Sequence, residues 1–235
     1  MEDMYRIVDG FENVATSGFF GVYDGHGGRQ VSRYLHKHLD KNIELELKAM
    51  ENSSIAHAFG RAYLITDIQC CQETSETCGA TAVTCIIRQE NNHRVLHTAN
   101  VGDSRAVLCR KRKALRLSKD HKAEDPDECT RIRQAGGAVV KQRVMGILAV
   151  SRSFGDHGLK QYVIARPYTS TVRLGPEDAF VILACDGVWD VMSDQEAVDF
   201  VLAISNRANA AQSLVEEAMK RLSADNLTVV IVFLK

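Results

Sequence analysis

The sequence lacks an excess of charge of either sign, a long apolar run and a signal-peptide pattern. Its 29 basic and 30 acidic residues nearly cancel, so nothing in the composition favours nucleic acid or an anionic membrane as a partner. No apolar stretch approaches the roughly 20 residues that a membrane helix needs, and no charged start precedes an apolar core. We therefore expect a soluble, intracellular protein with no membrane or nucleic-acid partner.

The seven cysteines also lack a C-x-x-C pair. Their spacing does not suit a compact zinc site, and Cys85 and Cys185 lie inside apolar runs, where a thiol serves as a small apolar side chain. Such usage is typical of a reducing compartment. It predicts a cytoplasmic location that extends to the nucleus.

Apolar residues recur with helical or alternating spacing along the chain, without a linker or an internal repeat. The 235 residues are therefore interpreted as one domain. Strands joined by short turns, with helices arriving in pairs, favour an α+β fold with antiparallel sheets. The predicted helices are residues 29–47, a helix capped by Ser53 or Ser54 that runs to Cys71, 124–134, 194–204 with Asp194 as its cap, and 209–222. The predicted strands are residues 5–8, 19–23, 81–87, 95–101, 106–109, 148–150, 171–174, 179–185 and 227–234.

Residues 19–28 combine an apolar strand with a carboxylate and a histidine at its end. The run Phe-Phe-Gly-Val-Tyr stops at Asp24, and the glycines around His26 leave the backbone free to turn. Carboxylate and carbonyl oxygens are the ligands that Mg²⁺ and Mn²⁺ prefer. The alternative is an ordinary Asp-Gly turn, and carboxylates elsewhere in the chain decide between the two interpretations.

Further carboxylates lie at strand ends, at tight turns and at the chain start. They are Glu2, Asp3, Asp103, Asp186, Asp190 and Asp225. If they converge, they repel one another and raise their pKa values unless cations offset the charge. Oxygen ligands without a cluster of cysteine or histidine favour Mg²⁺ or Mn²⁺ over zinc.

Two such ions close together can activate a water and neutralise a phosphoryl group, so the pattern predicts metal-assisted phosphoester hydrolysis. His26, beside Asp24, is the candidate general acid for the leaving alkoxide. The sequence has no P-loop, no G-x-G-x-x-G and no EF-hand spacing, and no nucleophile with an adjacent base competes. The substrate class stays open on these grounds.

Eight motifs, ordered along nearly the whole chain, resemble those of the type 2C (PPM), metal-dependent protein serine/threonine phosphatases. They are Met-Glu-Asp at 1–3, Asp-Gly-His-Gly-Gly at 24–28, Cys-Gly-Ala-Thr-Ala at 78–82, Ala-Asn-Val-Gly-Asp-Ser-Arg-Ala at 99–106, Gln-Ala-Gly-Gly at 134–137, Leu-Ala-Val-Ser-Arg-Ser-Phe-Gly-Asp at 148–156, Cys-Asp-Gly-Val-Trp-Asp at 185–190 and Asp-Asn-Leu-Thr-Val at 225–229. The resemblance implies a four-layer α-β-β-α sandwich, with two antiparallel sheets packed face to face and helices outside each. It also implies a single catalytic domain over residues 1–235, with residues 119–167 as a flap that governs substrate choice.

The resemblance further implies a binuclear Mg²⁺ or Mn²⁺ centre that activates a bridging water. Asp24 would bridge the two ions. Asp186 and Asp225 would hold one ion, and Glu2 and the carbonyl of Gly25 would hold the other.

Four more residues receive roles from the same motifs. His26 would be the general acid, and Asp3 would orient water on the metal. Asp103 and Asp190 would hold a weaker third ion.

The chain start departs from the family pattern. In the family an arginine shortly before Met-Glu-Asp binds the substrate phosphate, and an opening strand precedes it, whereas here the motif begins at Met1. Arg6 lies on the wrong side of the motif. Loss of that contact should weaken catalysis by about 1.5–3 kcal/mol if nothing replaces it. Glu2 is expected to fray, and the sheet to lose an edge partner.

The expected substrates are phosphoserine and phosphothreonine in proteins, hydrolysed by a monomer. One alternative is a catalytically weakened pseudophosphatase that acts as a binding module, because the phosphate-binding arginine is absent. Another is a phosphatase of small metabolites, which would use the same metal chemistry.

Overall fold

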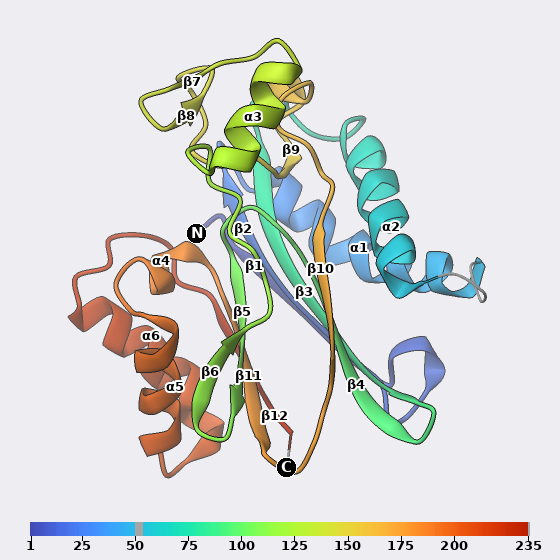
Figure 1. Ribbon diagram of the computed structural model, residues 1–235, viewed down its shortest axis with the longest axis vertical. Coiled ribbons are helices and arrows are strands. Elements are labelled where there is room, and N and C mark those ends of the chain that lie inside the picture. The colour runs from blue at the N-terminus through green and yellow to red at the C-terminus, as the bar shows by residue number, and fades with distance from the viewer. Residues whose placement is uncertain (50–53, 235) are drawn as a thin grey trace.

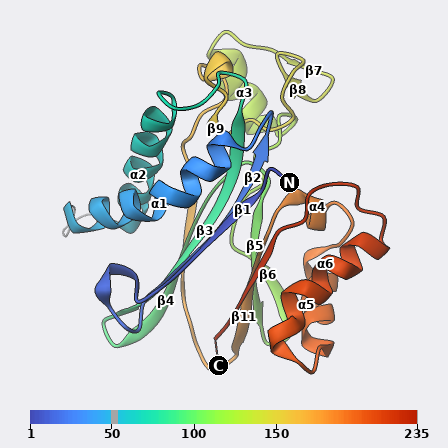
Figure 2. The same cartoon turned by 180° about the vertical axis from the view of Figure 1, so that it is seen from behind.

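The computed structural model describes residues 1–49 and 54–234. Two antiparallel sheets pack against each other through an apolar core, with helices on their outer faces (Figures 1 and 2). The first sheet has the order β1 (Met4–Asp9), β2 (Gly18–His26), β3 (Gly79–Glu90), β4 (His93–Val101) and β10 (Tyr168–Arg173), with β9 (Phe154–Gly155) paired to β3. The second has the order β12 (Val229–Phe233), β11 (Asp178–Ala184), β5 (Arg105–Arg110) and β6 (Lys113–Arg116).

Helices cover the outer face of each sheet. The helices are α1 (Gln30–Ala49) and α2 (Ile55–Cys70) on the first sheet, α5 (Asp194–Ala203) and α6 (Ala210–Lys220) on the second, and α3 (Pro126–Gln134) and α4 (Asp186–Trp189) beyond the strand ends. Short 3-10 helices lie at Phe11–Asn13, His157–Leu159 and Arg207–Asn209. No helix of the described chain has both the length and the apolar character needed to cross a bilayer. The α+β prediction is confirmed, and the layers agree with a four-layer sandwich.

Strand side chains alternate between two cores because successive residues point to opposite faces of a sheet. In β2, Val22 joins the apolar cluster between the sheets, whereas Tyr23 joins the cluster under α1 and α2. In β5, Leu108 faces the first sheet, whereas Val107 packs with residues of α5 and α6. Both faces of each sheet are therefore covered, which holds the strand ends in fixed relative positions.

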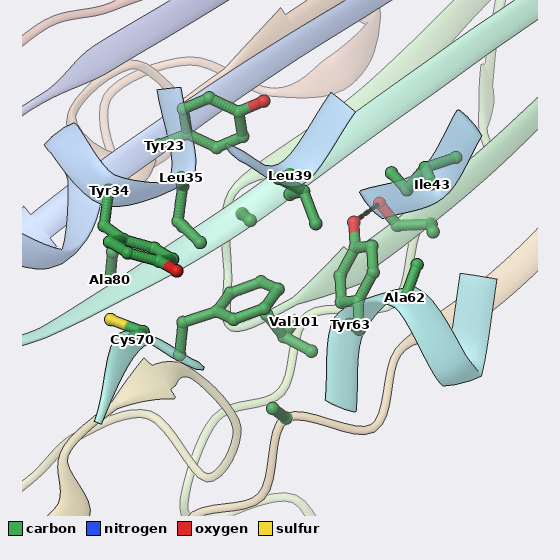
Figure 3. Close-up of a cluster of buried hydrophobic side chains, with 14 of the residues drawn as sticks. Tyr23, Tyr34, Leu35, Leu39, Ile43, Ala62, Tyr63, Cys70, Ala80 and Val101 are labelled. Carbon is green, nitrogen blue, oxygen red and sulfur yellow. Dashed lines mark hydrogen bonds between the residues drawn. The ribbon is translucent and has the colours of Figure 1, made fainter. Parts of the chain in front are cut away.

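The periodicity of α1 accounts for its packing. Leu35, Leu39 and Ile43, four residues apart, are fully buried against the first sheet. Figure 3 shows them in one cluster with Tyr63 of α2. The Tyr63 hydroxyl also forms a hydrogen bond with Thr84 Oγ1 at 2.8 Å. The helix predicted for residues 29–47 is confirmed with slightly shifted ends.

The helix α2 begins as the sequence predicts. Ser54 is its N-cap and accepts a hydrogen bond from the backbone N–H of His57. Ser53, the alternative cap, lies outside the described residues.

Two local predictions are wrong. The run 148–150 is not a strand, because Leu148 and Val150 form isolated bridges with different partners, Val144 and Lys122. Asp194 does not cap α5. Ser193 is the N-cap in a reciprocal capping box with Glu196, which leaves the Asp194 carboxylate free to bind arginines of the sheet.

The strand β6 is absent from the elements expected from the sequence. Lys111 and Arg112, which precede it, both have positive φ, which is the conformation of a two-residue hairpin turn. This turn folds residues 113–116 back onto β5.

The chain start is held in place, so the expected fraying of Glu2 is wrong. The backbone N–H of Glu2 donates to Asn226 Oδ1 at 2.7 Å, and Ser32 Oγ donates to the Glu2 carbonyl. Beyond it, β1 pairs along its whole length with β2. These bonds place residues 1–3 beside α4, at one end of both sheets (Figures 1 and 2).

Residues 119–167 form an excursion beyond this end of the sheets. It contains α3, the hairpin β7 (Val139–Val140) and β8 (Arg143–Val144), and a small apolar cluster that includes Ile132 and Val163. Its central anchor is the buried Glu128, which accepts hydrogen bonds from Arg131, Arg152 and Ser151. The anchor joins α3 to the segment that leads into β9.

We expect Glu128 to make the excursion sensitive to acid. Burial alone would raise the pKa of Glu128, but Arg152 and Arg131 lower it from 4.5 to about 2. Because the folded pKa lies below the unfolded value, the carboxylate stabilises the protein above pH 4.5, and this contribution is lost as the pH falls towards 2. Glu128→Gln should cost about 3–5 kcal/mol at neutral pH, since the half-buried guanidinium groups of Arg131 and Arg152 lose their buried counter-charge.

Urea unfolding of the parent and Glu128→Gln over a pH series measures this effect. The parent should lose stability more steeply than the variant between pH 4.5 and 2. Glu124→Gln, at an exposed glutamate of the same segment, is the matched control. Parallel pH profiles for parent and Glu128→Gln would contradict the assignment.

Candidate active site

A cavity of about 390 Å³ lies where the two sheets end. Its walls include seven residues singled out from the sequence. They are Glu2, Asp24, Gly25, His26, Asp103, Asp186 and Asp225. The structure therefore brings together carboxylates that are up to 223 residues apart in the chain (225 minus 2).

Two strands from different sheets deliver the central carboxylates. Asp24 belongs to the last part of β2, where it pairs with Thr81 of β3. Asp186 follows β11 and begins the short helix α4. Because the inter-sheet core fixes these strands, both side chains face the same cavity.

The electrostatics of the cavity are unfavourable for its carboxylates by themselves. Burial, followed by the charges of Asp3 and Asp186, raises the pKa of Asp24 to about 10. Burial, Asp103 and Asp190 raise the pKa of Asp186 to about 6. The site concentrates negative charge that only protons or cations can offset.

Asp3 does not line the cavity but lies behind it. Its side chain is buried, and one oxygen accepts a hydrogen bond from Thr228 Oγ1 at 2.8 Å. The other oxygen, Oδ1, has no hydrogen-bond partner in the described part of the chain. Burial raises the pKa of Asp3, as it does that of Asp24. A buried carboxylate oxygen without a partner is a place where a water or an ion would normally bind.

Gly25 is required by the close approach of the chain start. A Cβ atom at this position would overlap the carbonyl oxygen of Glu2 and crowd Ser32 Oγ. Glycine therefore lets residues 1–3 lie against the end of β2, which brings Glu2 to the cavity.

The donor set fits a hard divalent cation. The cavity offers carboxylates and a backbone carbonyl, without a cluster of cysteine or histidine, and this chemistry suits Mg²⁺ or Mn²⁺. In residues 1–49 and 54–234, however, no three side chains of histidine, cysteine, aspartate or glutamate form a ready-made metal cluster. The carboxylates share a cavity rather than a closed coordination shell.

The pair expected to hold a third ion has a cation of its own. Lys122 Nζ lies 3.5 Å from Asp103 Oδ2 and 3.7 Å from Asp190 Oδ1. Asp190 is not among the residues lining the cavity. Burial alone would lower the pKa of Lys122, but Asp103 and Asp190 raise it, so the ammonium stays charged. A metal ion between these two carboxylates would compete with Lys122.

His26 is held by a carboxylate that the sequence analysis did not single out. Its Nε2 lies 2.8 Å from Asp156 Oδ2, and the same oxygen accepts a hydrogen bond from Ser153 Oγ. Asp156 is buried, has φ 50°, and donates its backbone N–H to the carbonyl of Cys78 at 2.7 Å. The sequence feature that could have identified Asp156 is its position as the last residue of the motif at 148–156.

A second missed residue is Arg143 of β8. It lines the same cavity as the carboxylates, together with Leu148, Ala149 and Val150 of the excursion. Its Nη1 donates to the carbonyl of Ile147 at 2.8 Å. The excursion thus places a cation at the edge of an acidic cavity.

Comparison with known proteins identifies this arrangement. The model of the family described as protein phosphatase 2C matches residues 1–227. The chain belongs to the protein phosphatase 2C family. Protein phosphatase 2C homolog 1 of Schizosaccharomyces pombe is 43% identical over 236 residues, which cover 99% of this chain and 68% of that protein. The homologue of the same name from Saccharomyces cerevisiae is 40% identical, over 100% of this chain and 88% of that protein.

Solved structures show the same fold. A serine-threonine phosphatase 2C from Toxoplasma gondii superimposes with a TM-score of 0.83 at 26% identity, over 94% of this chain and 86% of that one. A Caenorhabditis elegans sex-determining protein gives a TM-score of 0.91 at 26% identity, over all of this chain and 61% of that one. This protein phosphatase 2C is therefore a hydrolase of phosphoric monoesters with the family's fold.

Gly79 tests the pairing of His26 with Asp156 in this phosphatase. A Cβ atom on Gly79 would overlap both Asp156 Oδ2 and His26 Nε2, so Gly79→Ala should force the two side chains apart. We expect kcat for a phosphopeptide to fall by about 100-fold, because a displacement of about 1 Å in an active site can reduce the rate by that factor.

The matched control is Gly60→Ala on α2, where an added Cβ meets nothing within 4 Å. It should keep full activity and gain about 1 kcal/mol of stability. Asp156→Asn, which changes charge rather than volume, should also lower kcat. Full activity of both Gly79→Ala and Asp156→Asn, with a native near-UV circular dichroism spectrum, would rule out the pairing as functional.

Proposed function

We propose that this phosphatase hydrolyses phosphoserine and phosphothreonine in proteins with divalent cations held by the carboxylates of the cavity. The observation that carries the proposal is the convergence of Asp24 and Asp186 from facing sheets in a cavity where neither carboxylate forms an ion pair with a described residue. Bound Mg²⁺ or Mn²⁺ would supply that charge, an activated water and neutralisation of the phosphoryl oxygens.

The residues present fit two ions by their places around the cavity. Asp24 would contribute to both, Asp186 and Asp225 to one, and Glu2 with the carbonyl of Gly25 to the other. Their spread around one cavity supports this division.

Three further carboxylates have proposed roles. Asp3, whose Oδ1 has no partner behind Asp24, would accept a hydrogen bond from water in the site. Asp103 and Asp190 would hold a weaker third ion in competition with Lys122.

His26 is the proposed general acid. With Nε2 directed at Asp156, Nδ1 is the ring nitrogen left to donate a proton to the leaving serine or threonine oxygen. Asp156 fixes the orientation and tautomer of the ring, and Ser153 in turn fixes Asp156. In this proposal His26 supplies the proton, and Asp156 and Ser153 hold its ring in a fixed orientation.

Arg143 favours an active enzyme over the pseudophosphatase alternative. The family's phosphate-binding arginine before Met-Glu-Asp has no counterpart in the chain as given, yet the cavity contains a guanidinium from β8. One of its nitrogens bonds to Ile147, and the remaining donors suit a substrate phosphate. We further propose that the phosphatase acts as a monomer on phosphoproteins of the cytoplasm and nucleus.

Metal dependence gives the direct test. Release of phosphate from a phosphoserine peptide should require Mn²⁺ or Mg²⁺ and stop in excess chelator. Asp186→Ala should lower kcat by at least about 100-fold. Loss of a residue that only supports a metal ligand already costs up to about 100-fold, and Asp186 is proposed as a ligand itself. Asp9→Ala, at an exposed aspartate of β1, is the control.

Turnover that persists in excess chelator or in Asp186→Ala would contradict the metal proposal. A folded protein that binds Mn²⁺ by calorimetry without turning over any phosphopeptide would be a pseudophosphatase. A sugar phosphate assayed on the same preparation should react much more slowly than the phosphopeptide, and the reverse order would indicate a metabolite phosphatase.

The role of His26 is tested through the leaving group. His26→Asn should lower kcat for a phosphoserine peptide by about 10²–10⁴-fold, the usual contribution of general acid catalysis. An aryl phosphate with an acidic phenol needs little protonation, so its kcat should fall much less. Equal losses for both substrates would show that His26 does not act as the general acid.

A further inference from the structure

A second cavity, of about 420 Å³, adjoins the catalytic one. Glu2 lines both, and the neighbouring glycines Gly27 and Gly28 line the catalytic and the second cavity respectively. The second cavity also contains Arg29 and Arg33 at the start of α1. A substrate chain advances only about 3.3–3.6 Å per residue, so residues beside the one in the catalytic cavity can reach this space.

Arg29 and Arg33 form one exposed pair of cations. The backbone N–H of Arg33 donates to the carbonyl of Arg29 at 3.1 Å, so the two residues lie one helical turn apart on the same face. Both are exposed, and neither guanidinium makes a hydrogen bond or ion pair with a described residue. Elsewhere on the described surface, Arg61 and Arg221 are paired with glutamates.

The positions of Arg29 and Arg33 do not stabilise helix α1. Like charges four residues apart on a helix repel each other, and cations at a helix start oppose the helix dipole. Glu2 is the only carboxylate among the residues that line this cavity, so the two arginines leave it with a net positive charge. Since paired arginines bind phosphate through several parallel hydrogen bonds, the arrangement suits a phosphate group.

We propose that Arg29 and Arg33 bind a second phosphate on the substrate, carried by a residue close to the phosphoresidue being hydrolysed. The proposal rests on the proposed function, because it concerns the substrate of the same active site. It makes this phosphatase selective for multiply phosphorylated segments.

The test compares singly and doubly phosphorylated peptides of one sequence. The second phosphoresidue is placed one or two positions before or after the target residue. The ratio of kcat/KM for the doubly over the singly phosphorylated peptide should exceed about 10 in at least one placement, and Arg29→Ala/Arg33→Ala should bring it down at least about 10-fold. Arg29→Lys/Arg33→Lys should restore part of the ratio, because lysine keeps the charge but not the paired donors.

Lys41→Ala is the matched control, since it removes an exposed cation from the same helix outside this cavity. It should leave the ratio unchanged. A ratio that is near one in the parent for every placement, or that is unaffected by the double alanine variant, would overturn the inference. Absence of turnover of every phosphopeptide, singly and doubly phosphorylated, by the parent would instead overturn the proposed function.

Discussion

Repulsion between carboxylates is the constraint on which this active site depends. Asp24, Asp3 and Asp186 are held close enough that burial and mutual charge raise the pKa of Asp24 to about 10. The local backbone conformation cannot hold these three carboxylates together, because they lie on separate segments of the chain. The arrangement persists because β2 and β11 are locked by an apolar core between two sheets and by helices outside them. The stability of the sandwich therefore supports an unfavourable cluster of charges, which suits the proposed binding of divalent cations.

The excursion of residues 119–167 contributes to this site from outside the sheets. Arg143 and residues 148–150 line the cavity, and Asp156 of the same excursion holds His26. Glu128 ties α3 to Arg152, four residues before Asp156. A change in the excursion should therefore reach His26, the proposed general acid, through Glu128, Arg152 and the short segment that leads to Asp156.

Local chemistry accounts for much of what could be predicted. The apolar period of α1, the serine cap of α2 and the strand-end position of Asp24 depend on neighbours in sequence, and all three are found. The errors were also local. Residues 148–150 have strand-forming side chains but find no continuous partner, and Ser193 rather than Asp194 takes the cap because its hydroxyl meets the N–H of Glu196.

The sequence by itself determined the α+β class, the family and the carboxylates that line the cavity, because short motifs and periodic patterns encode them. Only the tertiary structure decided which cations and carboxylates meet them. Asp156 lies 130 residues from His26, Lys122 lies 68 residues before Asp190 (190 minus 122), and Arg143 reaches the cavity from a two-residue strand. Such pairings leave no periodic signal, since they depend on how distant segments pack rather than on any neighbour in the chain. The hold on Glu2 is of the same kind, because its partners Ser32 on α1 and Asn226 before β12 lie 30 and 224 residues away in the chain.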